Sequence, residues 1–251
     1  MKFSICIEPV LENVDFYDRF KIAKDIGYDA VEFWEPEKFD AKKLAEASVK
    51  ANIPIVGMTI FDTRVSSVNL PWRALKDNFI KTIEYGKEAG CKNYIALTGY
   101  VQSKGDSQKM AIVENLKRMG EIAEKEGVQV VVECLNSMTD HLGYYLDNAY
   151  EGFDIIRAVG SDNIKLLFDI YHMQLMQGNL TDSICQNVQD IGHIHSAGVP
   201  GRHEHMDTEV NYPALIKKIE AAGYDKYFGL EYFPTYDNAQ SLADCLAYLK
   251  S

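Results

Sequence analysis

Long apolar runs are absent from this chain of 251 residues. A helix that crosses a bilayer needs about eighteen or more consecutive apolar residues, and no such stretch occurs. The opening "MKFSICIEPV" carries only a short apolar run before Glu8, which is too little for a secretory signal. We therefore expect no transmembrane helix, no membrane partner and a cytoplasmic protein.

Paired cysteines are also missing. No C-x-x-C pair is present to indicate a zinc site or a redox dithiol. The five cysteines are odd in number and lie far apart, at Cys6, Cys91, Cys134, Cys185 and Cys245. We expect them to be reduced thiols, mostly buried.

Positive charge is scarce as well. Lys and Arg together number 26 against 37 Asp and Glu, which gives a formal net charge of −11. Binding to phosphate backbones requires clustered Lys and Arg, so this balance opposes a nucleic-acid partner. A small-molecule substrate is the expected partner, and the sequence leaves a homo-oligomer open.

The chain has no linker, no low-complexity stretch and no G-x-G-x-x-G after its first apolar run, which disfavours a doubly wound dinucleotide-binding sheet. Short β-rich runs instead alternate with amphipathic segments such as 72–90 and 212–224. Strands that alternate with helices pair in parallel, and eight such units predict a single-domain α/β protein, a (β/α)₈ TIM barrel over 1–251. The expected strands are 3–8, 29–33, 54–59, 93–98, 128–133, 164–169, 191–195 and 227–231.

The last four expected strands end on Glu133, Asp169, His195 and Glu231. In a barrel of this kind, the C-terminal ends of the strands carry the chemistry. Carboxylate and imidazole ligands suit a divalent cation such as Mg²⁺, Mn²⁺, Co²⁺ or Zn²⁺, and without one the clustered anions would repel each other. We expect one ion bound by all four side chains; the alternative for each alone is a solvated residue at the start of a loop.

Two histidines accompany these strand ends. His172 follows Asp169 by one short turn and is a candidate substrate ligand, with a histidine that caps the next helix as the alternative. His193 lies two residues before His195, on the same strand face but one layer deeper. We expect His193 to be a buried, hydrogen-bonded residue that supports His195.

Two loops are further candidates for substrate contacts. In "SAGVPGRHEHMDTEVNY", Arg202 offers a planar fork of donors to a carboxylate, while Glu204 and His205 are candidate polar contacts or solvated surface residues. In "CLNSMTDHLGYYLDN", Asn136 and His141 either touch the substrate or cap a turn.

Several blocks of the sequence resemble the hydroxypyruvate isomerase family of xylose-isomerase-like TIM barrels. They are "VVVECLNSMTDHLGYYLD", "LLFDIYHMQLMQGNL", "IGHIHSAGVPGRHE" and "EVNYPALIKKIEAAGYDKYFGLEYFP", with "GYDAVEF" and "GCKNYIALTG" as weaker matches. The resemblance spans nearly the whole chain and is strongest over 128–234. It implies an aldose–ketose type isomerase that acts on a small hydroxy-carbonyl compound such as hydroxypyruvate or a 2-oxo-tetronate. The family's two catalytic glutamates fall on Glu133 and Glu231, and its metal-site aspartate falls on Asp169.

The chain departs from that family at three places. Cys134 stands where the family usually has Asn, and His195 stands where it has Gln. The stretch 59–72, "TIFDTRVSSVNLPW", does not reproduce the family's Asn-Leu-Pro-Ala-Gly-Asp-Trp segment. His195 instead resembles ketose 3-epimerases and inosose dehydratases, whose sites use Glu, Asp, His and Glu, so an epimerase or a dehydratase-like lyase is the alternative function.

The expected chemistry is proton transfer through an enediolate. One glutamate of the pair Glu133 and Glu231 removes a proton beside the carbonyl group and the other returns a proton to the adjacent carbon. Two rival functions use the same barrel. An apurinic-site endonuclease needs extra histidines on early strands, but all six histidines here lie between 141 and 205. A non-catalytic sugar-binding barrel would have no need of the carboxylate pair.

Overall fold

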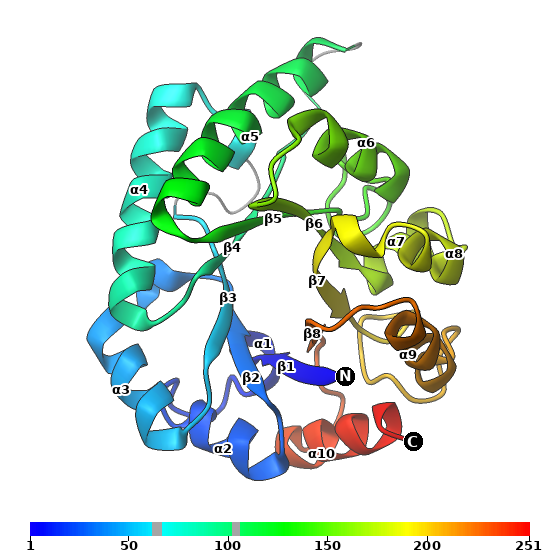
Figure 1. The fold of residues 1–251 in the computed structure, drawn as a ribbon. Coiled ribbons are helices and arrows are strands. Elements are labelled where there is room, and N and C mark those ends of the chain that lie inside the picture. The colour runs from blue at the N-terminus through cyan, green and yellow to red at the C-terminus, as the bar shows by residue number, and fades with distance from the viewer. Residues whose placement is uncertain (62–66, 102–105) are drawn as a thin grey trace.

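A computed structural model describes residues 1–61, 67–101 and 106–251, and shows a closed ring of parallel strands surrounded by helices (Figure 1). Each strand pairs with its sequence neighbours, and the first strand pairs with the eighth. The strands are β1 (Lys2–Cys6), β2 (Ala30–Phe33), β3 (Ile55–Thr59), β4 (Asn93–Ala96), β5 (Gln129–Glu133), β6 (Ile164–Asp169), β7 (Ile191–Ser196) and β8 (Tyr227–Leu230). The predicted (β/α)₈ barrel is confirmed.

Helices cover the outside of this ring in Figure 1. The α-helices are α1 (Ile7–Val10), α2 (Arg19–Ile26), α3 (Ala41–Ala51), α4 (Trp72–Ala89), α5 (Ser107–Glu126), α6 (Ala149–Val159), α7 (Ile170–Met176), α8 (Leu180–Cys185), α9 (Tyr212–Ala221) and α10 (Asn238–Leu249). Short 3₁₀ turns occur at Pro36–Lys38, Ser67–Asn69 and Val188–Asp190.

Glycines and a polar side chain mark the ends of several helices. Helices α2, α4 and α5 each stop at a glycine in the left-handed conformation, at Gly27, Gly90 and Gly127. Only glycine adopts this conformation without a Cβ penalty, so the chain can turn back toward the next strand there. At the N-terminus of α6, the Asn148 side chain accepts hydrogen bonds from the backbone amides of Tyr150 and Glu151.

The strands are buried on both faces, as expected for a parallel barrel covered by helices. In β6, for example, every residue except Lys165 is buried. The side chains that face outward pack under the helices, while those that face inward fill the barrel or reach its C-terminal rim. The apolar core therefore lies mainly between the strands and the helices.

Strand register decides which side chains meet at the rim. Asp169 pairs with His195 across β6 and β7, and His195 pairs with Gly229 across β7 and β8. Glu231 follows β8 directly, and its amide donates to the carbonyl of Ser196. Neighbouring strands thus bring these side chains to one level of the barrel.

Three other expectations bear on the fold. The five cysteines are unpaired, as predicted, and all but the half-buried Cys185 are buried. Within the described ranges, no helix combines the length and apolar character needed to cross a membrane. Residues 62–66, at the centre of the departing stretch 59–72, lie outside the residues that the structure describes.

Candidate active site

The four predicted ion ligands converge at the C-terminal rim of the barrel. Ligand atoms of Glu133, Asp169, His195 and Glu231 all lie within 4.8 Å of one another, and all four residues are buried. His195 is central: its Nδ1 lies 3.2 Å from Glu133 Oε1 and 3.6 Å from Glu231 Oε1. The cluster joins four consecutive strand ends into one polar centre.

Burial shifts the protonation of two of these carboxyl groups. Burial, helped by Glu231 and Glu133, raises the pKa of Asp169 to about 7 against the opposing charge of Arg202. Burial likewise raises the pKa of Glu133, with the charge of Glu231 adding to it. Without an ion, Asp169 and Glu133 therefore keep their protons to a higher pH than ordinary carboxylic acids do.

The pKa of the His195 imidazole is raised as well. Burial would lower the pKa of His195, but the charges of Glu231 and Glu32 outweigh it and raise the pKa well above its ordinary value. Oxygen and nitrogen donors in this combination are the ligands of a divalent cation, and its charge would replace the protons that relieve the repulsion. The residues present fit such an ion.

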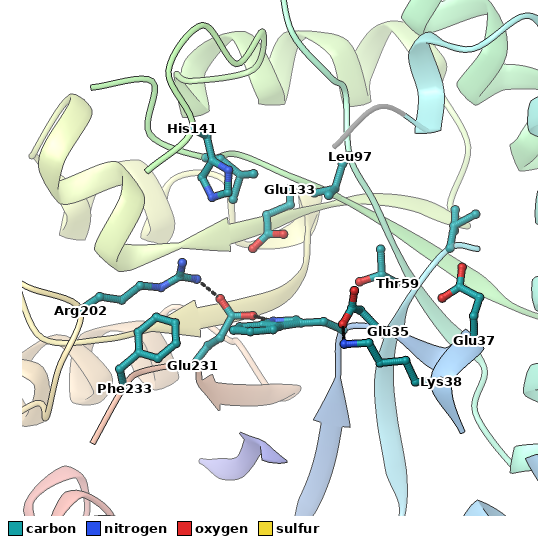
Figure 2. A pocket seen from close by; sticks show the side chains of 13 residues that line it. Glu35, Glu37, Lys38, Thr59, Leu97, Glu133, His141, Arg202, Glu231 and Phe233 are labelled. Atoms are coloured by element: carbon teal, nitrogen blue, oxygen red, sulfur yellow. Dashed lines mark hydrogen bonds and ion pairs between the residues drawn. The ribbon is translucent and has the colours of Figure 1, made fainter. Parts of the chain in front are cut away.

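Arg202 supplies a fixed positive charge beside the cluster. Its guanidinium pairs with Glu231 Oε2 (Figure 2). The guanidinium also lies 5.5 Å from the ring centre of Tyr171 and 5.9 Å from that of Phe233. Burial alone would lower the pKa of Arg202. The neighbouring carboxylates, with Glu231 as the largest contributor, outweigh burial and raise the pKa above its ordinary value, so the side chain remains a cation. Its buried Nε has no hydrogen-bond partner within the described residues.

His172 is held as a neutral hydrogen-bond donor. The Oδ1 of Asn136 accepts from the backbone amides of Thr139 and Asp140, at 3.0 Å each, which fixes the orientation of the Asn136 amide group. The Nδ2 of Asn136 therefore faces His172 Nδ1, at 2.7 Å, and donates to it. Burial and the charge of Arg202 lower the pKa of His172 well below its ordinary value. A neutral ring that accepts at Nδ1 carries its proton on Nε2.

The Nε2 of His172 is the free end of this arrangement. It is buried, has no hydrogen-bond partner within the described residues, and lies 3.6 Å from Asp169 Oδ2. A buried donor without a partner is costly unless a ligand completes it. His172 thus offers a hydrogen bond beside the carboxylate cluster.

The remaining predicted contacts divide between the cavity and the loop interior. His141 lines the cavity and its ring lies 5.5 Å from that of His172. Asn136 is fully buried, and its side-chain amide is hydrogen-bonded to the His172 ring. His205 is buried behind the rim, where its Nε2 lies 2.9 Å from Ser196 Oγ, and burial lowers its pKa to about 3.

Glu204, which the sequence left open as a polar contact or a solvated surface residue, is 8% exposed. Its Oε1 accepts from the Thr235 amide and the Ser241 hydroxyl, at 2.8 Å each, and its Oε2 accepts from Thr235 Oγ1 at 2.9 Å. The carboxylate joins the loop after β7 to the start of α10. Both of its oxygens are hydrogen-bonded there, and Glu204 is not among the residues that line the cavity.

Sequence reasoning missed two polar residues of this centre. Trp34, directly after β2, donates from Nε1 to Glu231 Oε1. Glu32, inside β2, lies 2.9 Å from the Nε2 atoms of both His193 and His195. Burial would raise the pKa of Glu32, but these histidines lower it more strongly, so it is an anion. An acidic residue in the middle of the apolar run "DAVEF" was the available signal.

A cavity of about 830 Å³ opens above the cluster. Glu133 and Glu231 both point into it, and Arg202 reaches over from the loop after β7 (Figure 2). Its walls are largely apolar, from Trp34, Ile60, Leu97, Leu135 and Phe233, with Glu35, Glu37, Lys38, Thr59 and His141 at other points of the lining. Such a lining excludes water while a few polar groups orient a small ligand.

Comparisons with known proteins agree with the fold. The model of the xylose isomerase-like TIM barrel family matches residues 20–251. Hydroxypyruvate isomerase from Escherichia coli K12 is 30% identical and covers 93% of this chain and 94% of its own. The 2-oxo-tetronate isomerase of Cupriavidus necator is 31% identical over 99% and 98%. A crystal structure named AP endonuclease, family 2, from Brucella melitensis superposes with a TM-score of 0.92 at 27% identity, over 98% of each chain.

The raised pKa of Asp169 predicts an unusual pH dependence of stability when a chelator is present. Between the ordinary pKa of 3.8 and about 7, the folded protein keeps a proton that the unfolded chain has lost. The contribution of Asp169 to the free energy of unfolding therefore falls as pH rises from 3.8 to about 7. Asp169→Asn removes the charge and retains the oxygen that accepts from the His172 amide. In EDTA, the Tm of Asp169→Asn minus that of the wild type should increase from about pH 5 to about pH 8.

The same pair of proteins should reverse its order with an ion. With saturating Mn²⁺ the wild type should become the more stable, because the variant lacks one ligand. Asp162→Asn is the matched control, since the Asp162 side chain is fully exposed. Thermal unfolding followed by circular dichroism measures all of these values. A difference in Tm that is independent of pH in EDTA would contradict the burial of an ionisable cluster.

Proposed function

Because the chain belongs to the xylose isomerase-like TIM barrel family, we propose that it is a metal-assisted isomerase of a short hydroxy-carbonyl acid such as hydroxypyruvate or a 2-oxo-tetronate. The observation that carries this proposal is the pair Glu133 and Glu231, both buried, both facing His195 Nδ1 and both lining one cavity. Two carboxylates in a shielded site suit a reaction that moves a proton between neighbouring carbons.

The ion site would consist of Glu133, Asp169, His195 and Glu231. A divalent cation held there supplies positive charge to the substrate oxygens, which stabilises the negative charge that develops on them. Burial raises the pKa values of Asp169 and Glu133, and both groups would have to lose their protons to become ligands, so binding of the ion would release protons.

Proton transfer falls to the two glutamates. One removes the proton from the carbon beside the carbonyl group, which forms an enediolate, and the other protonates the adjacent carbon. Glu133 is buried, lines the cavity and has its Oε1 3.2 Å from His195 Nδ1, which holds its carboxylate in place for this step. Glu231 is oriented by Arg202 on one oxygen and by Trp34 on the other.

The remaining polar groups suit an acidic substrate. His172 offers a neutral Nε2–H beside the cluster, which can hold a substrate oxygen without adding charge. Arg202 presents a buried guanidinium at the cavity wall, and such a fork pairs best with a carboxylate. The two relatives above are named for hydroxypyruvate and 2-oxo-tetronate, and both compounds carry a carboxylate.

A second candidate is a ketose 3-epimerase or an inosose dehydratase-like lyase. The residue that favours it is His195, because the sequence resembles the Glu, Asp, His and Glu sites of that group at this position. Either reaction would use the same proton transfer beside a carbonyl group. Nuclease activity, suggested by the name of the Brucella structure, finds less support: the net charge is −11 and the sequence has no histidine before residue 141.

The glutamate pair gives the first activity prediction. Glu133→Gln and Glu231→Gln should each lower turnover by about 100-fold or more, the usual scale for a lost acid–base group. Turnover is measured with hydroxypyruvate and Mn²⁺, and the reaction in D₂O should place deuterium on the product carbon. Glu204→Gln is the matched control, because its carboxylate is bound in the loop, and it should retain turnover near the wild-type value.

Three outcomes would count against this assignment. Unchanged turnover in both Gln variants would exclude the proton-transfer pair. Product without solvent deuterium would indicate hydride transfer between carbons instead. Loss of water from the substrate would favour the dehydratase-like lyase.

Arg202 gives the second activity prediction, which concerns the class of substrate. Arg202→Lys keeps the charge but loses the fork, so kcat/KM for an acidic substrate should fall by about 1–3 kcal/mol of transition-state stabilisation. A neutral ketose lacks the carboxylate and should lose much less. Because the pairing of Arg202 with Glu231 affects both substrates alike, the neutral ketose serves as the control. An equal loss for both would favour the 3-epimerase.

A further inference from the structure

Glu32 lies inside the barrel, below the carboxylate cluster, and is 1% exposed. It comes from β2, yet it contacts two residues of β7, which is not adjacent to β2 in the barrel. Its Oε2 lies 2.9 Å from His193 Nε2 and 2.9 Å from His195 Nε2, while its Oε1 accepts from Ser4 Oγ at 2.7 Å. The carboxylate thus crosses the interior and joins both histidines.

The proton positions follow from this geometry. The Oε2 atom of Glu32 lies at hydrogen-bond distance from two imidazole nitrogens, and a carboxylate oxygen is an acceptor, so each histidine places a proton on the Nε2 that faces Glu32. One carboxylate oxygen has room for both donors. His195 has only one other ring nitrogen, and this Nδ1 is the atom that faces Glu133 and Glu231. Glu32 therefore determines which nitrogen of His195 is left for the cluster.

Two glycines leave the space that this carboxylate occupies. A Cβ on Gly229 would lie 2.5 Å from Glu32 Oε1 and 2.9 Å from His195 Cδ2. A Cβ on Gly57 would lie 2.9 Å from Glu32 Oε2. All three distances are shorter than ordinary contacts, so a side chain at either position would displace the carboxylate. Strands β3 and β8 thus form a socket around Glu32.

We propose that Glu32 is a positioning residue for the ion site: it keeps a proton on Nε2 of His195 and so presents Nδ1 as the ligand atom. This inference rests on the proposed ion site. His193 holds the same carboxylate oxygen from the next layer, which prevents Glu32 from turning away when His195 engages an ion. A carboxylate behind a ligating imidazole also makes that imidazole a stronger ligand.

Glu32, His193 and His195 also form a group that could itself hold a metal ion. An ion at that place would remove both Nε2 protons and would make His195 a bridge between two ions. The hydrogen-bond pattern favours the positioning role, because the Oε2 atom lies at ordinary hydrogen-bond distance from both nitrogens. The second ion is therefore an outcome that the tests must distinguish.

The first test observes the proton directly in the wild-type protein. With ¹⁵N-labelled histidine and one equivalent of Zn²⁺, long-range ¹H–¹⁵N spectra should show His195 protonated at Nε2 and ion-bound at Nδ1. His193 should be protonated at Nε2 as well. A proton on Nδ1 of His195, or loss of the Nε2 protons of both histidines, would overturn the proposal.

The second test measures the affinity for the ion by calorimetry with Mn²⁺. Glu32→Gln retains an oxygen acceptor but loses the charge that draws the Nε2 protons, so the Kd should rise about 10- to 100-fold, the usual range for a residue behind a metal ligand. The visible spectrum of bound Co²⁺ should also change. Ser4→Ala is the matched control: it removes the bond to the other oxygen of the same carboxylate and should change the Kd by less than about threefold.

The outcomes separate the two proposals. If the wild type binds no divalent ion at all, the proposed function fails, and the positioning role fails with it. If the wild type binds the ion and Glu32→Gln binds it equally well with the same Co²⁺ spectrum, only the role of Glu32 fails. Should Glu32→Gln not fold, the protonation of His195 in the wild type still decides the matter.

Discussion

The repulsion between three carboxylates buried within a few ångströms is the constraint on which the rest of the site depends. Glu133, Asp169 and Glu231 surround the single imidazole of His195, and burial denies them the water that would normally stabilise their charges. The protein offsets the repulsion with retained protons, with the cationic Arg202 and with the imidazole itself. A bound cation would offset it more directly, because its charge would replace those protons between the carboxylates.

The barrel holds these side chains together because its strands are paired in a fixed register. Asp169 lies opposite His195, and His195 lies opposite Gly229, so the cluster is fixed by backbone pairing that does not depend on the cluster's own charge. Polar residues around the cluster fix the orientation of two imidazole rings: Glu32 orients His195, and Asn136 orients His172. The result is a preorganised site, in which little rearrangement is needed when charge develops on a substrate.

The part of this site that could be predicted from sequence is the part set by strand ends. Each apolar run that stops on Glu133, Asp169 or His195 marks a change from core to rim, and parallel pairing places such ends together. Glu32 could not be found in this way, since it lies within β2 and reaches across the interior, a contact that depends on the closed barrel. The surroundings of Glu204 could not be decided from the sequence, because its hydrogen-bond partners, Thr235 and Ser241, lie more than 30 positions further along the chain. Asn136 was assigned to the right region, but its partner His172 lies 36 positions further along the chain.

The most direct test of this account is to locate the ion. Crystals grown with Mn²⁺ and measured for its anomalous scattering should show one peak per chain, within bonding distance of Glu133, Asp169, Glu231 and the Nδ1 of His195. An absence of any peak at the C-terminal rim, or a peak between Glu32 and the two histidines of β7 with none above it, would contradict the central claim that the carboxylate cluster is a cation site.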